Sequence, residues 1–492
     1  MKRILAAAVA AASISAFAAW ERVGSVQIAD AKTQGEAAAK IGQMVGNPFA
    51  AAAIGAALAD VPTVKFFGPA REGASTLLTL FLDGDAVAKS PGDALDDLEY
   101  AVLYPVSLSR ADFLKRHEGA AETNGVVVVK GDLSGEDADS ETTYVAFSRD
   151  GKWAGASDKA EQAKLALRDV KLAEKHMKGE VARLRVSQKG VKALALSLKA
   201  QAKSAEDADE VRQIEAVTSF SCGLKVSGLG LDLNFSVSFE DGSEFAKCGL
   251  KPLGENPLAF ASAEAVEAAA RAEDSGCSKW ESDEKWNALL DVFRKHGVDL
   301  GRFLVREKKD AVTSYTVDIE ALFKFLSGEA EETLGKIDTG KLLEDVQKLS
   351  GGEKFAAKSP ASFDEVRVKG FKPQWTVAER FAATMPDAAA KKPFYVSFTT
   401  ISSFLKATVP HGLSLVPDEQ RDGMKPILET FAEEAKPGVA IVGWRPKDGG
   451  TMRFTLRVSS DEVRCVGGVV SAAMMGGFGF GDGDDDDGED ED

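Results

Sequence analysis

The sequence has few of the side chains on which enzyme active sites most often depend. Among 492 residues there are four histidines and four cysteines. Histidine titrates near neutral pH, so acid–base catalysis by histidine has few candidates here. There is also no HExxH zinc motif, no GxSxG nucleophile motif and no CxxC pair. These absences exclude the classes of enzyme that the three motifs define.

Each of the four histidines has a local explanation that needs no catalysis. His176 belongs to a charged helical segment, and His296 falls in the last turn of a predicted helix, where positive charge suits the helix dipole. His117 lies in a polar loop and His411 follows a proline. We therefore assign no catalytic, cofactor-binding or metal-binding residue. We expect a protein that is not an enzyme and binds no cofactor.

Two near-matches to catalytic motifs fail on inspection. Residues 335–342 have the Gly-x4-Gly-Lys spacing of a phosphate-binding loop. A leucine stands where magnesium binding needs Ser or Thr, and a glutamate-rich segment replaces the preceding strand. The pairs Ser403 with Lys406 and Ser282 with Lys285 match the Ser-x-x-Lys pattern of acyl transfer. Their companion motifs are absent, and helices explain both spacings.

Excess positive charge and long apolar runs are also missing. The net charge is -17, and nine carboxylates lie among the last eleven residues. A mildly acidic body without a basic stripe disfavours nucleic acid and anionic membrane surfaces as partners. Beyond the N-terminus there is no run of about twenty apolar residues, so no transmembrane segment is expected.

The first residues have the pattern of a secretory signal peptide. Lys2 and Arg3 precede a short apolar run, and Ala16 and Ala18 form a small-x-small cleavage site. The run is too short to span a bilayer. We expect residues 1–18 to be removed and the protein to be exported, either to the periplasm or outside the cell.

The C-terminal segment 476–492 is rich in glycine and aspartate. Counting from Asp482, its carboxylates partly match a calcium-binding EF-hand loop, but Asp487 stands where that loop needs glycine. The chain also ends before the last ligand position. Repulsion between neighbouring carboxylates predicts a disordered, solvated tail, with weak binding of cations or of a basic partner as the alternative.

The body of the chain contains internal similarity. Four blocks recur in the same order, at offsets between about 210 and 221. The paired blocks are 101–115 with 313–326, 158–167 with 376–385, 184–200 with 394–409, and 231–242 with 451–461. They predict two tandem similar units, at residues 62–255 and 257–475. An alanine-rich helical segment at 19–61, with Asn47 and Pro48 at a helix start, precedes them.

Periodicity predicts the fold class of each unit. Apolar and polar residues alternate strictly from 231 to 239, which is typical of an antiparallel strand with one covered face. Hairpins are expected at 219–239, at 142–157 and at 438–458. Apolar residues at helical spacing predict amphipathic helices at 282–297 and 338–352. We therefore expect an α+β fold in which antiparallel hairpin sheets pack against amphipathic helices.

The cysteines allow more than one arrangement. Cys222, Cys248, Cys277 and Cys465 form an even set, so one or two disulfides are possible in an oxidising compartment. If residues 218–250 form a simple meander, Cys222 and Cys248 lie two strand spacings apart, about 9–10 Å. A disulfide does not reach that far. If 243–250 is instead a short helix, Cys248 has other partners, and free buried thiols remain equally open.

These observations favour a non-catalytic binding or scaffold protein of the bacterial envelope. Its ligand would lie at the seam between the two units or on a concave sheet face, because interfaces between related units often form binding sites. A peptide, a glycan or an apolar chain would fit this hypothesis. Four tryptophans are candidates to line the site, although core positions suit each of them better: Trp153, Trp280, Trp375 and Trp444. The alternative is an extracellular hydrolase built from carboxylates and hydroxyls distant in sequence.

Overall fold

The structure is a computed structural model. It describes residues 20–46, 62–93, 98–131, 142–175, 177, 179–202, 211–275, 283–328, 337–350, 359–413, 435–446 and 450–475. Several features predicted from sequence lie outside these ranges, namely the signal peptide, the helix start at Asn47, His176, Cys277, Trp280, Ser282 and the acidic tail.

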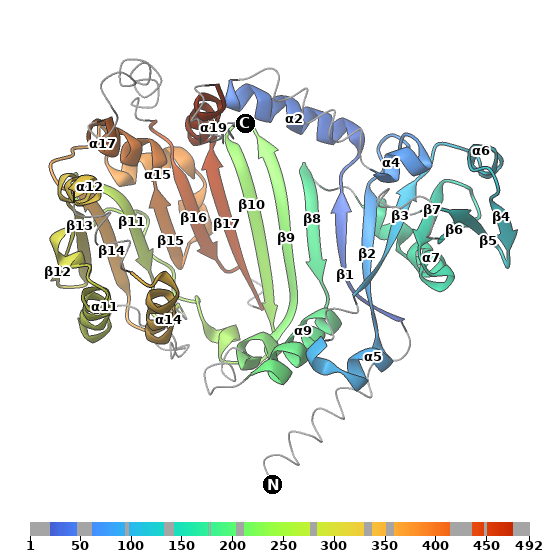
Figure 1. Cartoon of the computed structure of the whole chain (residues 1–492), viewed down its shortest axis with the longest axis horizontal. Coiled ribbons are helices and arrows are strands. Elements are labelled where there is room, and N and C mark those ends of the chain that lie inside the picture. Colours follow the sequence, from blue (N-terminus) through green and yellow to red (C-terminus); the bar gives the residue numbers. More distant parts are fainter. Residues whose placement is uncertain are drawn as a thin grey trace, which may run out of the picture.

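The described strands form one 17-stranded sheet (Figure 1). From its outer edge to the middle, the first half of the chain supplies β4 (Ala121–Thr123), β5 (Val126–Lys130), β6 (Thr142–Phe147), β7 (Trp153–Ser157), β3 (Glu99–Pro105), β2 (Thr76–Asp83), β1 (Trp20–Ile28), β8 (Glu180–Val186), β9 (Val217–Ser227) and β10 (Gly230–Phe239). From the middle to the far edge, the second half supplies β17 (Thr451–Ser459), β16 (Val439–Trp444), β15 (Tyr395–Thr399), β11 (Ala265–Arg271), β14 (Ser362–Val368), β13 (Val312–Val317) and β12 (Leu304–Lys309).

The two halves meet where β10 pairs with β17. The register runs from Gly230 opposite Ser459 to Ser238 opposite Thr451, and the pairing is antiparallel. Of the strand pairs in the described sheet, only β13 with β14 is parallel. Parallel neighbours need a crossover connection, and the described part of that connection carries two helices, α12 (Ile319–Gly328) and α14 (Thr339–Ser350).

Both edges of the sheet are poor templates for pairing with another chain. The edge strand β4 is three residues long and fully exposed. At the opposite edge, β12 has the sequence LVREKK, so charged side chains line most of it. Short edge strands and edge charges prevent edge-to-edge association of sheets.

Helices cover both faces of the sheet. Those of the first half are α2 (Ala31–Val45), α4 (Pro62–Phe67), α5 (Gly84–Lys89), α6 (Arg110–Arg116), α7 (Ala160–Ala166), α8 (Val170–Ala173) and α9 (Gln188–Gln201). Those of the second half, in addition to α12 and α14, are α11 (Asp283–Lys295), α15 (Val377–Thr384), α16 (Ala388–Lys391), α17 (Ile401–Leu413) and α19 (Ser460–Met475). Short 3-10 turns are η1 (Pro91–Asp93), η2 (Leu167–Asp169), η3 (Phe245–Lys247) and η4 (Leu300–Arg302).

We call the side of the sheet that carries Arg185, Ser221, Ser236 and Arg453 the arginine face, because these residues lie opposite one another in register. On this face α7 and α8 cover the first-half core around Leu77 and Leu103. On the same arginine face, α15 and α16 cover the second-half core. On the opposite face α2 and α9 pack on β9, whereas α19 packs on β10 and β17. Figure 1 shows α2 and α19 near one end of the central strands and α9 near the other.

Most of the predicted elements are present. The hairpins β6–β7, β9–β10 and β16–β17 form as predicted. The helices α11 and α14 begin and end within the predicted ranges. Helices and a large, mostly antiparallel sheet occur together, so the α+β class is correct.

Two predictions need correction, and one of the two arrangements left open at 218–250 is excluded. Residues 19–61 are not helical throughout, because Trp20–Ile28 forms β1, which pairs with both β2 and β8. The meander of three strands at 218–250 does not form, because β10 has β17 as its second neighbour and Phe245–Lys247 is a 3-10 turn. The polar side of β10 is not uniformly wet, since Asp232 is 5% exposed.

Three of the four cysteines lie among the described residues. Cys222 and Cys465 are free thiols, and Cys248 is a buried thiol that donates to the Glu244 carbonyl (3.4 Å). Burial raises the pKa of the Cys222 thiol and raises that of Cys465 to about 11. The short helical turn at Cys248 was the second of the two arrangements considered.

Candidate functional site

The polar side chains on the arginine face form rows that cross the junction between the halves. One row runs from Ser25 on β1 through Arg185, Ser221, Ser236 and Arg453 to Trp444 on β16. The next row runs through Gln27, Arg183, Gly223, Asn234 and Thr455. Such rows arise because directly opposite residues of neighbouring strands point to the same side of a sheet.

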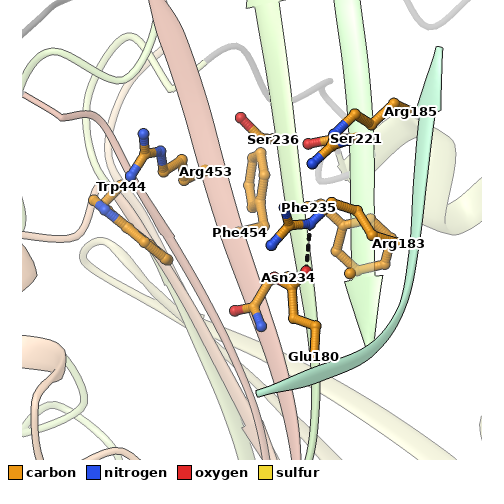
Figure 2. Close-up of a pocket in the computed structure, with 11 residues that line it drawn as sticks. Glu180, Arg183, Arg185, Ser221, Asn234, Phe235, Ser236, Trp444, Arg453 and Phe454 are labelled. Atoms are coloured by element: carbon orange, nitrogen blue, oxygen red, sulfur yellow. Dashed lines mark hydrogen bonds and ion pairs between the residues drawn. The ribbon is translucent and has the colours of Figure 1, made fainter. Parts of the chain in front are cut away.

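A cavity of about 400 Å³ lies over these rows, and we call it the junction groove. Its lining residues are Glu180, Arg183 and Arg185 from β8, Ser221 and Gly223 from β9, Asn234, Phe235 and Ser236 from β10, Arg453 and Phe454 from β17, and Trp444 from β16. Figure 2 shows Arg183 and Arg185 reaching from β8 toward the middle of the groove, with Arg453 and Trp444 together on its far side. The floor therefore combines strands from both halves of the chain.

The groove is bounded by the two groups of covering helices. On the first-half side, Gln27 Nε2 donates to the carbonyls of Leu172 (3.3 Å) and Lys175 (3.0 Å), at the end of α8. On the second-half side, the Lys391 ammonium of α16 lies 4.6 Å from the centre of the Trp444 ring. Between these contacts the four strands β8, β9, β10 and β17 present polar side chains to the cavity.

The one carboxylate among the lining residues is neutralised by an arginine. Glu180 forms an ion pair with Arg183, whose guanidinium also donates to the Met177 carbonyl (3.4 Å). The Glu180 carboxyl lies directly over Gly223, where a Cβ would come within 2.6 Å of it. Glycine at position 223 therefore leaves the space that this ion pair occupies.

The other two arginines have little local compensation. The pKa of the Arg185 guanidinium is lowered, first by burial and then by the charges of Arg183 and Arg22, although the charge of Glu180 opposes this shift. Its hydrogen bond to Gln27 Oε1 is long, at 3.5 Å. Arg453 is exposed and has no hydrogen bond or ion pair to another described residue. The groove thus carries net positive charge, which favours an anionic ligand.

Next to the groove, one buried ion pair links the two halves. Arg457 on β17 donates from Nε (2.6 Å) and from a terminal nitrogen (2.8 Å) to the two carboxylate oxygens of Asp232 on β10. It also donates to the carbonyl of Thr384 at the end of α15 (3.0 Å). The hydrogen bonds to Asp232 raise the pKa of Arg457. This pair fixes the register of β10 and β17 from inside the protein.

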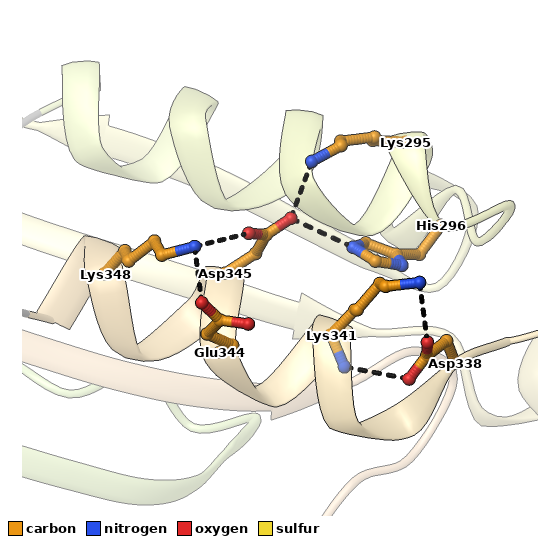
Figure 3. Close-up of polar contacts among 7 residues, drawn as sticks. All are labelled: Lys295, His296, Asp338, Lys341, Glu344, Asp345 and Lys348. Carbon is orange, nitrogen blue, oxygen red and sulfur yellow. Dashed lines mark hydrogen bonds and ion pairs between the residues drawn. The ribbon is translucent and has the colours of Figure 1, made fainter.

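The three described histidines lie outside the groove, each in a structural contact. His117 packs against the rings of Phe66 and Phe113 (4.7 and 4.4 Å between centroids), and burial lowers its pKa. His296 lies 3.2 Å from Asp345 at the contact of α11 with α14 (Figure 3). His411 is in α17. None of these three histidines lines the groove.

The near-match motifs lie at helices where the structure describes them, whereas Ser282, Gly335 and Lys336 are outside the described residues. The Gly-Lys of the phosphate-loop spacing lies in the first turn of α14, where the Lys341 N–H donates to Asp338 (3.0 Å; Figure 3). Ser403 is completely buried in α17 and accepts a hydrogen bond from Arg380. Three of the four candidate tryptophans are described: Trp153 is in the core, Trp375 lies beside Arg380, and of these three only Trp444 lines the groove.

A second polar cluster is fully enclosed. The Glu462 carboxylate of α19 accepts from Thr400 Oγ1 (3.0 Å) and from the Ser402 N–H (3.2 Å) at the start of α17. Arg380 of α15 donates to Thr400 Oγ1 (3.1 Å). Glu462 and Ser403 are 0% exposed, so the cluster holds three helices together and offers no access to a ligand.

Comparisons with known proteins add no assignment: no protein-family model, no curated protein and no solved structure matches this chain. Within the described ranges, no group of three or more His, Cys, Asp or Glu side chains is placed to hold a metal ion. None of the described helices is both long enough and apolar enough to cross a membrane.

The arginines of the groove were not predicted from the sequence, although a signal for them exists. In "EVARLRV" and "MRFTLRV" arginines occupy alternate or every-fourth positions of strands, so each pair shares one face. The net charge of the whole chain is negative and gives no indication of this local excess of arginine. Recognising that the two strands lie near each other required the pairings of β9 and β10, which sequence periodicity does not provide.

Proposed function

We propose that this chain is a non-catalytic binding protein whose ligand lies in the junction groove. The observation that carries the proposal is the position of the groove: its floor comes from both halves, and helices border it on two sides. A ligand there touches β8 and β17 at once. Sites between related parts of a chain are common places for ligands.

The floor favours recognition by side chains. Each floor strand is paired on both sides, so its main-chain N–H and C=O groups are used within the sheet. Arginine, serine and asparagine side chains remain to bind the ligand. Of the ligands considered from sequence, an apolar chain fits this polar floor least well.

We propose further that the two halves are tandem copies of one unit. In each half, four antiparallel strands follow the same order next to the junction, β1-β8-β9-β10 in the first and β11-β15-β16-β17 in the second. A helix follows the second strand in both, α9 after β8 and α17 after β15. Under this proposal the first unit begins at β1 rather than at residue 62.

The hydrolase alternative has no specific support among the described residues. It requires carboxyl groups of raised pKa in an accessible pocket. Burial raises the pKa of Glu267 and Glu462, but neither residue lines the groove.

We also propose that the protein is exported to the bacterial periplasm or beyond. The mass of the mature protein tests this proposal, because removal of residues 1–18 leaves Ala19 at the N-terminus.

The experiment is native mass spectrometry of the protein purified from its own host. The wild type is expected to retain a ligand mass. Ser236→Trp, which fills the floor of the groove, is expected to lose it, whereas the control Asp241→Trp places the same bulk at an exposed position beyond β10 and keeps it. A ligand that stays bound to Ser236→Trp, or the absence of any ligand mass on the wild type, contradicts the proposal.

A further inference from the structure

The cationic groups of the junction groove are arranged in two separate places. Arg183 and Arg185 belong to β8, and Arg453 belongs to β17. Three strand spacings separate these strands, so their backbones are about 14 Å apart. A single small anion does not contact both places in full. An elongated ligand with repeated anionic groups does, provided that it lies across the strands.

Between the two cationic places the floor is neutral and hydrogen-bonding. Ser221, Ser236 and Asn234 lie between β8 and β17 in register with the arginines. Hydroxyl and amide side chains both donate and accept hydrogen bonds, so they match ligand groups that do the same. Sugar hydroxyls have this property, whereas phosphate chains only accept.

The groove does not suit a peptide that binds by strand addition. That mode needs a free strand edge for main-chain hydrogen bonds. The four floor strands have no free edge, because each is paired on both sides. Trp444 adds an aromatic wall beside Arg453, and aromatic side chains combine an apolar surface with a polar handle.

We infer that the ligand of the junction groove is an acidic oligosaccharide, a linear chain of sugars that carries carboxylates. This inference rests on the proposed function, because it names the ligand class of the same groove. Arg185 and Arg453 bind carboxylates at two points of the chain through charge-assisted hydrogen bonds. The serine and asparagine side chains bind the ring hydroxyls between those points.

The test is calorimetric titration of the full chain with four probes of defined chemistry. These are hexagalacturonate as the acidic oligosaccharide, maltohexaose as its neutral counterpart, hexaglutamate as an acidic peptide, and tripolyphosphate. Hexagalacturonate is expected to bind most tightly, and its affinity to fall as the salt concentration rises. Maltohexaose is expected to bind weakly or not at all.

Substitutions then separate the two cationic places. Arg185→Gln and Arg453→Gln are each expected to weaken hexagalacturonate binding by roughly 10- to 100-fold, the range for a lost hydrogen bond to a charged group. Arg294→Gln is the matched control, because Arg294 is exposed on α11 and pairs with Asp291 outside the groove. Circular dichroism of each variant checks that its fold is intact.

Other outcomes overturn the inference. Equal binding of maltohexaose, tighter binding of hexaglutamate or tripolyphosphate, arginine variants that bind like wild type, or no binding of hexagalacturonate would each contradict an acidic oligosaccharide. The proposed function fails separately. If maltohexaose binds and Ser236→Trp abolishes that binding, the groove is a ligand site and only the ligand class is wrong. If none of the four probes binds and the protein from its host carries no ligand, both the proposed function and the ligand class fail.

Discussion

The two halves of the sheet agree beside their junction and differ away from it. Beside the junction, both halves have four antiparallel strands in the same order, with a helix after the second strand. Further out, the first half adds six antiparallel strands, β2 to β7, whereas the second adds β12, β13 and β14 with one parallel pair. The common part therefore builds the floor of the groove, and the unlike parts build the outer cores.

Corresponding helices also differ in how they begin. In the first half, Ser187 precedes α9, and its hydroxyl accepts from the Gly190 N–H (3.3 Å). In the second half, the Glu462 carboxylate accepts from the Ser402 N–H at the start of α17. Both helices share a hydroxyl cap, because Thr400 Oγ1 accepts from the Ser403 N–H (3.3 Å) as Ser187 accepts from Gly190. The Glu462 carboxylate is an additional acceptor at the start of α17. Only the second arrangement depends on pH.

The largest effect is expected where the halves are joined. Asp232→Asn leaves the buried Arg457 without its counter-ion, so the free energy of unfolding is expected to fall by about 3–5 kcal/mol. Urea unfolding measured by circular dichroism checks this. Glu320→Gln, which removes an exposed ion pair within α12, is the control and is expected to leave the midpoint unchanged. Equal effects of the two substitutions would show that the Asp232 pair does not join the halves.

Matched truncations compare the two outer cores. Leu77 of the first-half core and Leu258 of the second-half core are 0% and 1% exposed. Leu77→Ala and Leu258→Ala are each expected to destabilise the protein by about 2–5 kcal/mol, through lost burial and the cavity left behind. Because one sheet runs through both cores, each variant is expected to shift a single unfolding transition. Two separate transitions, each moved by one variant only, would mean that the halves unfold independently.

The different helix starts predict a difference in pH dependence. Burial raises the pKa of Glu462, so the stabilisation linked to its protonation is full below the ordinary carboxyl pKa and is lost as the pH rises through the folded value. Between the unfolded and the folded pKa of Glu462, the free energy of unfolding of the wild type is expected to fall by about 1.4 kcal/mol for each unit that the pH rises, relative to that of Glu462→Gln. Urea unfolding from pH 4 to pH 8 measures this difference. Ser187→Ala in the first half is the control, and its effect is expected to be independent of pH.

The smallest effect is expected at the surface of the second half. Asp345 accepts from Lys295 (2.7 Å) and His296 (3.2 Å), which together with Lys348 hold the pKa of Asp345 well below its usual range (Figure 3). Because this pKa is lowered, the stabilisation is present above the ordinary carboxyl pKa and is lost as the pH falls. Asp345→Asn is therefore expected to lower the melting temperature slightly at pH 7 and low salt. If the melting temperature of Asp345→Asn stays lowered at high salt, the effect of this substitution is not electrostatic.

Local periodicity was sufficient for elements whose pattern is regular. Alternation from Leu231 to Phe239 predicted β10, and helical spacing around Trp286 predicted α11. The strand β1 was missed because its register shifts between Arg22 and Gly24, and that irregularity breaks the alternation of apolar residues. A pattern of period two identifies a strand only where the strand has no bulge.

The groove could be predicted only in part. The seam between two similar units was proposed as a binding place, and the groove lies where β10 meets β17. Its charge was not predicted, because Arg185 and Arg453 are distant in sequence and the intervening strands bring them to one face. The buried pair Asp232–Arg457 was missed for the same reason: an aspartate on the polar side of a strand is expected to be solvated.

The pairing of β10 with β17 has a consequence for the order in which the protein is made. Ser238 and Thr451, which face each other in the finished sheet, are 213 residues apart in the chain. During synthesis β10 therefore exists for a long time as a bare edge, with its donors and acceptors open to any other extended chain. That edge needs protection from the moment Phe239 is made until Ser459 follows. An unpaired strand edge is a place where the nascent polypeptide can aggregate.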